Sequence, residues 1–146
     1  MPDLVEATWP DADVAWQGVF EGDLRWSISH GVHVFVFNDV EALRRACGDA
    51  EAGAHSITYR KPDSAGVGAI VMLAQPVTLS AIVHEVTHVG LFWARGTTRR
   101  KQRAFNFLNH HTEYLPELIS NLSSVLWFSL PQDLLEPLGV EPADSD

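Results

Sequence analysis

The stretch from residue 79 to residue 96 constrains the fold more than any other part of the sequence. Its apolar residues recur at the spacing of an α-helix and share one stripe. That stripe consists of Leu79, Ile82, Val83, Val86, Gly90 and Trp93. The other side of the helix also carries apolar residues, Ala81, Leu91 and Phe92. Because a helix that is apolar nearly all round is usually buried on both sides, we expect other elements to cover both of its faces.

Two histidines four residues apart, His84 and His88, lie together on the side of this helix opposite the stripe. Their ring nitrogens can therefore bind one metal ion at about 2 Å. Glu85 lies roughly 100° further round the helix, where its carboxylate can act as a general base on a water molecule beside the ion. This HExxH pattern predicts a zinc site. The alternative is that both histidines only form hydrogen bonds within a core.

Burial of the helix would require partners for these three side chains. An unsatisfied buried polar group costs on the order of 1–3 kcal/mol, and more when it is charged. A metal ion would satisfy all three, and a catalytic zinc site usually adds a third protein ligand while leaving one position open. Glu113 is the best placed candidate, because a helix that follows a turn can pack across the first helix and present its opening residue to the ion.

A final helix is expected from about residue 113 to residue 130, where Pro131 stops it. One face is apolar and the opposite face is polar, the pattern of a surface helix. The apolar face carries Leu115, Leu118, Ile119, Leu122 and Leu126, and the polar face carries Glu113, Glu117, Ser120 and Ser124. If Pro116 makes the helix begin near Leu115, Glu117 lies in the first turn and would be the third ligand instead. A site without either acid is the remaining alternative.

Three further polar residues lie at or just before the start of this helix: His110, His111 and Tyr114. Either histidine could replace an acid as metal ligand. Each of the three side chains could also donate a hydrogen bond to an oxyanion that develops during hydrolysis.

The arrangement of His84, Glu85, His88 and a Glu113 on a following helix resembles the zincin metallopeptidases of the gluzincin group. The resemblance implies that the two histidines and Glu113 are zinc ligands and that Glu85 is the general base. It also implies that Glu117, one turn later, orients a ligand histidine.

The chain is also similar to short zincin-like proteins that phages often encode, over roughly residues 55–126. In folds of this kind the strand before the motif helix, here residues 67–74, would pair with an extended substrate.

Strand-like segments precede the motif helix. Apolar and polar residues alternate over residues 24–28, and residues 32–37 are rich in β-prone side chains. The residues typical of a turn at 29–31, between these segments, predict a hairpin. Residues 55–60 and 67–73 predict two further strands.

Capping residues set the expected helix ends. Asn38 is expected to cap a short helix, with Glu41 completing a capping box and Gly48 ending the helix. Thr78 and Gly96 mark the ends of the motif helix.

These elements predict an α+β domain with a small, mostly antiparallel sheet on one side of the motif helix and the C-terminal helix on the other. By length the 146 residues form one domain. Its core is expected at about residues 14–130, after an irregular arm at 1–13 and before an acidic tail at 131–146.

Composition narrows the possible partners and compartments. The formal net charge of −9 argues against nucleic acid as the main partner, because duplex binding normally requires a basic surface. Cys47 is the only cysteine, which excludes an intrachain disulfide and fits a reducing compartment. The N-terminus lacks the features of a secretory signal, and no apolar run is long enough to cross a membrane. We expect a cytoplasmic protein, in a bacterial host or associated with a phage particle.

The function expected from these observations is zinc-dependent hydrolysis of a peptide bond. Zinc would polarise the scissile carbonyl while Glu85 takes a proton from water and passes it to the leaving amine. The small size favours a narrow range of protein substrates over general degradation. The alternative is a non-catalytic zincin-fold module that binds another protein, such as a phage structural or host-directed factor, which the five tryptophans and acidic ends would fit. Hydrolysis of a non-peptide amide or ester is a third alternative.

Overall fold

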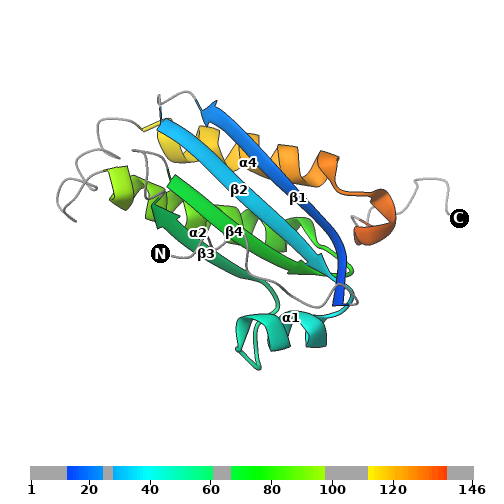
Figure 1. The fold of residues 1–146 in the computed structure, drawn as a ribbon. Coiled ribbons are helices and arrows are strands. Elements are labelled where there is room, and N and C mark those ends of the chain that lie inside the picture. The colour runs from blue at the N-terminus through cyan, green and yellow to red at the C-terminus, as the bar shows by residue number, and fades with distance from the viewer. Residues whose placement is uncertain (1–12, 25–27, 61–66, 98–111, 138–146) are drawn as a thin grey trace, which may run out of the picture.

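The computed structural model describes residues 13–24, 28–60, 67–97 and 112–137. In chain order the elements are β1 (Val14–Leu24), β2 (Ile28–Phe37), α1 (Val40–Cys47), β3 (His55–Arg60), β4 (Val67–Ala74), α2 (Leu79–Thr97), α4 (Tyr114–Ser129) and the short 3-10 helix η3 (Gln132–Leu134). The four strands form one sheet, and the expected α+β class is confirmed (Figure 1).

The strands lie in the order β1-β2-β4-β3. The two outer pairs, β1 with β2 and β3 with β4, are antiparallel, and the central pair is parallel, with Val34 opposite Val71. The sheet is therefore mostly antiparallel, as predicted. The continuous apolar run of β4 fits its central place, because a strand covered on both faces has no polar side.

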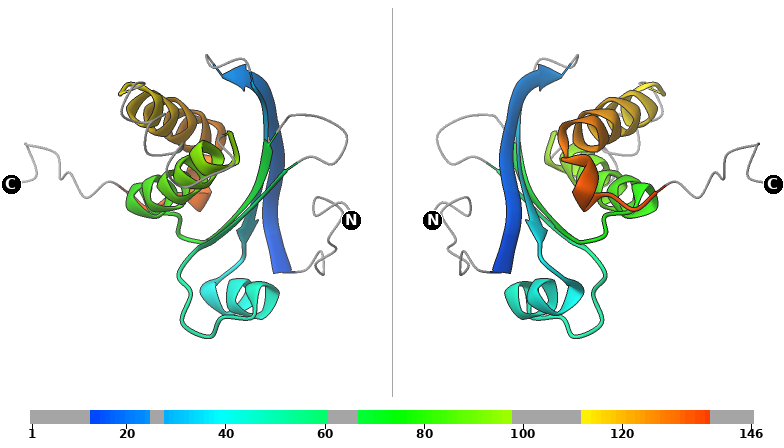
Figure 2. Two further views of the ribbon diagram at one scale, coloured as in Figure 1. Left: turned by 90° about the vertical axis from the view of Figure 1, so that its left-hand side faces the viewer. Right: turned by 90° about the vertical axis from the view of Figure 1, so that its right-hand side faces the viewer.

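The position of the C-terminal helix differs from the expectation. Helices α2 and α4 lie next to each other on the same face of the sheet and run in opposite directions (Figure 1, Figure 2). We expected α4 to cover the far side of α2. Both helices instead contribute to one core against the strands, because each has only one fully apolar stripe to bury. The outer side of α2 is left without a covering element among the described residues.

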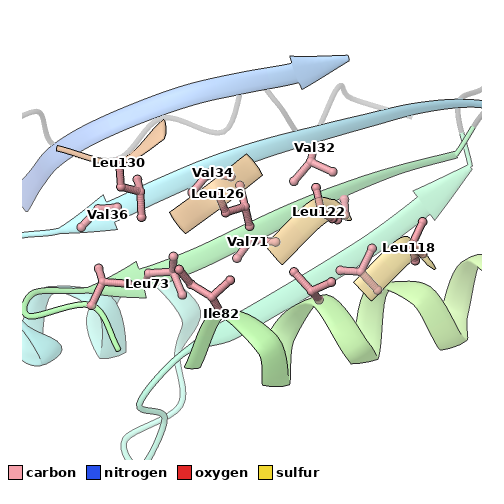
Figure 3. Packing of buried hydrophobic residues seen from close by; sticks show 14 of the residues in the cluster. Val32, Val34, Val36, Val71, Leu73, Ile82, Leu118, Leu122, Leu126 and Leu130 are labelled. Carbon is pink, nitrogen blue, oxygen red and sulfur yellow. The ribbon is translucent and has the colours of Figure 1, made fainter. Parts of the chain in front are cut away.

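The main core fills the space between the sheet and these two helices (Figure 3). Alternate residues of β2 and β4 point toward the helices, since successive side chains of a strand point to opposite faces. The labelled members are Val32, Val34, Val36, Val71, Leu73, Ile82, Leu118, Leu122, Leu126 and Leu130. A second cluster on the opposite face of the sheet joins Phe35, Phe37, Ile70 and Met72 to Ala42 and Leu43 of α1.

An N-terminal hairpin is confirmed, formed by β1 and β2, but its strands are not the predicted segments, and residues 25–27 of the predicted first strand lie outside the described residues. Strand β1 covers residues 14–24, and residues 29–31, expected to be the turn, belong to β2. Gly31 pairs with Glu21 on one side and with Gly68 on the other. Hydrogen bonding to two neighbouring strands therefore outweighs the local turn preference of residues 29–31. A β-bulge between Val14 and Trp16 interrupts the alternation that would have indicated β1.

The predicted N-cap of α1, Asn38, is wrong by one residue. The N-cap is Asp39, whose carboxylate accepts a hydrogen bond from the backbone N–H of Ala42 at 2.8 Å. Glu41 forms no capping box and instead binds Arg44 at 3.2 Å. Gly48 ends the helix as predicted, with φ of 76°, a conformation that glycine adopts without strain.

The long helices begin and end close to the predicted positions. The Thr78 hydroxyl accepts from the N–H of Ala81 at 3.0 Å, as an N-cap does, and α2 extends one residue past Gly96. Helix α4 begins at Tyr114, so Pro116 lies in the first turn, where backbone N–H groups have no helical acceptor and proline forfeits no bond. In the parts of the chain that the structure describes, no helix is both long and apolar enough for a membrane span.

Candidate metal centre on helix α2

The HExxH motif lies in the middle of α2, and its histidines are on the outer side of the helix. Ile82 and Val86 are fully buried against the sheet, whereas His84 and His88 are exposed. Leu91 and Phe92 are also exposed, at 41% and 52%. The expectation that both sides of this helix are buried is therefore wrong. The reason is the placement of α4 beside α2, which covers a flank of α2 but not its outer side.

The two imidazoles are close together. Their Nε2 atoms are 3.2 Å apart, and the ring planes are inclined by 75°. In the neutral pair one Nε2–H can donate a hydrogen bond to the other Nε2. Two nitrogens bound to one tetrahedral zinc, each at 2.0–2.1 Å, would be about 3.3 Å apart. The pair is thus already at the separation that a shared metal ion requires.

Glu85 differs from the histidines because it is buried. Its side chain is 7% exposed, and Oε2 lies 3.8 Å from Nε2 of His84. Ile82 and Val89, on the turns before and after, are fully buried, so Glu85 lies at the border between the packed side and the outer side of the helix. The argument from burial costs therefore applies to the carboxylate and not to the imidazoles. At this border Oε2 of the carboxylate is 3.8 Å from the exposed imidazole of His84.

Both candidate acids from the last helix are at the start of α4. Glu113 is the N-cap residue and is exposed, and Glu117 is half-buried in the first turn. Gly90 of α2 faces Leu115 and Leu118, but Gly90 is buried and lies roughly 200° round the helix from the exposed His88. The first turn of α4 is therefore level with the turn of α2 that follows His88, but it packs against a different side of α2 from the one that carries the histidines. The predicted polar face is also confirmed, since Ser120 and Ser124 are exposed.

The described residues contain no group of three or more His, Cys, Asp or Glu side chains close enough together to hold a metal ion. The structure brings together His84 and His88, with Glu85 beside them, and does not place Glu113 or Glu117 against them. His110 and His111 lie outside the described residues. The third ligand therefore stays a prediction.

Tyr114 is enclosed by protein, with 1% of its surface exposed. Burial raises the pKa of its phenol to about 12, because the charged phenolate is disfavoured away from water. A phenol in this position is a packing residue of α4, and the structure gives no support to a hydrogen bond from it to a substrate.

The strand expected to pair with a substrate cannot do so. Both edges of β4 are occupied, by β2 on one side and β3 on the other. The strand next to β4 on the sheet edge is β3, which also contacts α2. Ser56 and Thr58 of β3 pair with Val71 and Ala69, so their hydroxyls are on the face of the sheet that carries α2. The polar residues that alternate along β3, such as Ser56 and Thr58, are a signal by which the sequence could have distinguished β3 from the apolar, central β4.

Comparisons with protein-family models, with curated proteins and with solved structures gave no match for this chain. The interpretation of the site therefore depends on its own residues and on their geometry.

Proposed function

We propose that the protein is a zinc-dependent hydrolase that cleaves peptide bonds, with His84 and His88 as metal ligands and Glu85 as general base. The third ligand is an acid from the first turn of α4, with Glu113 at the N-cap and Glu117 one turn later as the two candidates. The observation that carries the proposal is the 3.2 Å separation of the two Nε2 atoms. It matches the spacing of two ligands on one tetrahedral ion.

Each residue has a separate task in this proposal. Bound zinc would supply Lewis acidity that polarises the scissile carbonyl and acidifies a water molecule. His84 and His88 present neutral imidazole nitrogens from one rigid helix, so that the ion is held without movement of the backbone. Glu85 accepts a proton from the attacking water and delivers it to the leaving amine. Its low exposure limits competition from bulk solvent for that proton.

The edge of the sheet offers a place for an extended substrate. On its outer edge β3 pairs with no described strand, and backbone groups on such an edge can pair with another chain. We propose β3 in place of β4 for this task. The substrate is a protein or peptide of narrow range, because the described residues form no extended second lobe around α2. The single thiol of Cys47 fits action in a reducing compartment such as the cytoplasm.

A Glu85→Gln variant tests this proposal. The amide keeps the shape of the side chain but cannot accept the proton, so zinc content should equal that of the wild type while cleavage falls by at least about 100-fold. Zinc-loaded proteins are incubated with a peptide library made from a bacterial proteome, and new termini are identified by mass spectrometry.

The matched control is Glu41→Gln, the same chemical change on the exposed surface of α1, which should cleave like the wild type. Equal cleavage by Glu85→Gln and wild type, or no zinc-dependent cleavage by the wild type, contradicts the proposal. Rapid digestion of unfolded casein would contradict the narrow range of substrates.

A non-catalytic module that binds another protein is the second candidate. The observation that favours it is the set of exposed apolar side chains on the two helices, with Phe92 at 52% and Phe128 at 83%. Such residues are common where a partner covers a surface. This candidate predicts that Glu85→Gln leaves partner binding unchanged, whereas Phe92→Ser or Phe128→Ser weakens it. The two functions therefore differ in the substitution that abolishes them: Glu85→Gln for hydrolysis, and Phe92→Ser or Phe128→Ser for partner binding.

A further inference from the structure

Strand β1 forms one edge of the sheet over its whole length. It covers 11 residues, Val14–Leu24, and among the described residues β2 is the only strand that pairs with it (Figure 1). In the right-hand view of Figure 2, β1 is the strand nearest the viewer. The N–H and C=O groups on the outer edge of such a strand can form hydrogen bonds with a strand of another chain.

The sequence of β1 lacks the residues that usually prevent pairing at an edge. Natural sheets protect long edges with lysine or proline, with bulges, or by keeping the edge strand short. Residues 14–24 contain no Lys, Arg or Pro. The bulge between Val14 and Trp16 is at the start of the strand, and the residues after it keep a regular register with β2. At the opposite edge, β3 has only 6 residues. The long edge of β1 is therefore open to pairing.

An antiparallel pair of two β1 strands has one register that uses the whole strand. Residues directly opposite each other in such a pair point to the same face of the sheet. A two-fold axis perpendicular to the sheet keeps each face on its own side, so the axis must pass through a residue and not between two. Val19 is the midpoint of residues 14–24. An axis at Val19 pairs every residue of β1, whereas any other axis leaves both strand ends unpaired.

In this register each aromatic residue of β1 is opposite a glycine of the second copy. Trp16 is opposite Gly22, and Phe20 is opposite Gly18. Cross-strand pairing with an aromatic side chain stabilises glycine in a sheet. The indole of Trp16 already lies over Gly18 of its own strand, so Phe20 of the second copy would meet that ring. Both aromatic side chains are half-buried at the margin of the main core, and a second copy would complete their burial.

On the other face of the sheet, the same register keeps the acidic residues apart. Glu21 is opposite Gln17. Asp23 is opposite Ala15, so no carboxylate is opposite another carboxylate, a pairing that would be destabilising. Val19 has an exposed fraction of 54% and is opposite Val19 of the second copy. Two exposed apolar side chains would therefore cover each other on the axis.

We propose that the protein is a homodimer in which two β1 strands pair antiparallel about an axis at Val19. The two sheets, each of 4 strands, then form one continuous sheet in the order β3-β4-β2-β1-β1-β2-β4-β3. Both β3 edges stay free in this dimer. The inference does not depend on metal binding or hydrolysis, because the histidine pair is on α2, which contacts β3 and β4. Its outcome is therefore separate from that of the proposed function.

Sedimentation equilibrium of the wild type is the first test. The chains carry a net charge of −9 each, so the measurement is made at about 0.15 M salt, where repulsion beyond about 8 Å is largely screened. We expect twice the monomer mass at about 0.1 mM protein, the behaviour of a dissociation constant well below that concentration. A monomer at this concentration overturns the inference and leaves the edge to a different partner. Large assemblies without a dimer overturn it as well.

Val19→Lys should weaken the dimer, because it places two ammonium groups opposite each other on the axis. We expect the dissociation constant to rise at least about tenfold. Circular dichroism checks the fold, which should persist because the side chain is exposed. Val83→Lys is the matched control, the same change on α2 at a side chain that is 37% exposed, and should dimerise like the wild type. Equal effects of the two substitutions contradict the inference.

A mixture of Val19→Lys and Val19→Glu tests the position of the axis. Each variant alone places like charges opposite each other, whereas a mixed dimer places opposite charges there. The mixture should therefore form dimers at a concentration at which each variant alone is monomeric. Absence of recovery in the mixture means that the two side chains do not meet, and the proposed register is then wrong.

Val19→Cys in a Cys47→Ser background provides a direct reading of the register, because the new thiol is then the only one in the chain. Directly opposite residues have Cβ atoms about 4.5–5.5 Å apart, close to what a disulfide requires, so mild oxidation should link the two copies. Gln17→Cys in the same background is the control. Its two thiols would be offset by four residues, about 13 Å, and should not react. Equal linking of both variants, or no linking at Val19, overturns the inference.

Discussion

The two sides of α2 differ in burial and in the role that we assign to them. The inner side, with Ile82, Val86 and Val89, is fully buried against the sheet and fixes the position of the helix. The outer side, with His84 and His88, carries the proposed chemistry and contributes little to the core. In the proposed site one helix therefore serves as both scaffold and site, and a rigid, packed element holds the two proposed metal ligands in place. The comparison predicts that stability and metal binding can be changed separately.

The largest effect on stability is expected on the inner side. Ile82→Ala should lower the free energy of unfolding by about 2–5 kcal/mol, because it leaves a cavity at a fully buried position. Val83→Ala is the neighbouring control, with a side chain that is 37% exposed, and should cost much less. Urea denaturation of the metal-free proteins measures both. Equal destabilisation of the two variants would contradict the assignment of Ile82 to the core. Loss of zinc binding by a folded Ile82→Ala variant would contradict the separation of stability from metal binding.

A smaller effect is expected at Tyr114, whose burial on α4 raises its pKa to about 12 from 10. The pKa is higher in the folded state, so the stability from the neutral phenol is complete below pH 10 and is lost as pH rises toward 12. The full loss is about 2–3 kcal/mol, and about half of it is expected by pH 11. Tyr114→Phe should lack this alkaline loss in urea denaturation at pH 8 and pH 11.

Absorbance titration of a Tyr59→Phe protein, which keeps Tyr114 as its only tyrosine, provides the direct reading. A midpoint near 12 in the folded protein and near 10 in urea is expected. A folded midpoint near 10 would show that the phenol is open to solvent, and the assignment of this side of α4 to the interior would be wrong.

Elements with strong local signals were predictable from the sequence. The periodicity of α2 and α4 and the apolar run of β4 depend on residues close together in the chain, and their bounds agree with the structure within one or two residues. Strand β1 was missed because its glycines and its bulge weaken the alternation. The turn predicted at residues 29–31 was wrong because pairing with β1 and β4, which no local pattern reveals, makes these residues part of β2.

The site was predictable only in its local part. His84 and His88 are one helical turn apart, so their proximity follows from helix geometry alone. The exposure of that side, the central place of β4 and the contact of Gly90 with α4 depend on how separate elements pack. Leu91 and Phe92 illustrate the limit, because their apolar character suggested burial although the structure leaves both exposed. Tertiary arrangement of this kind is not encoded in the period of one segment.

Zinc titration of the metal-free protein, followed by calorimetry and elemental analysis, tests the central claim most directly. Wild-type protein should bind one equivalent of zinc, and the His84→Ala, His88→Ala double variant should bind none while remaining folded by circular dichroism. A double variant that binds zinc with wild-type stoichiometry and affinity, or a folded wild type that binds none, would contradict the account.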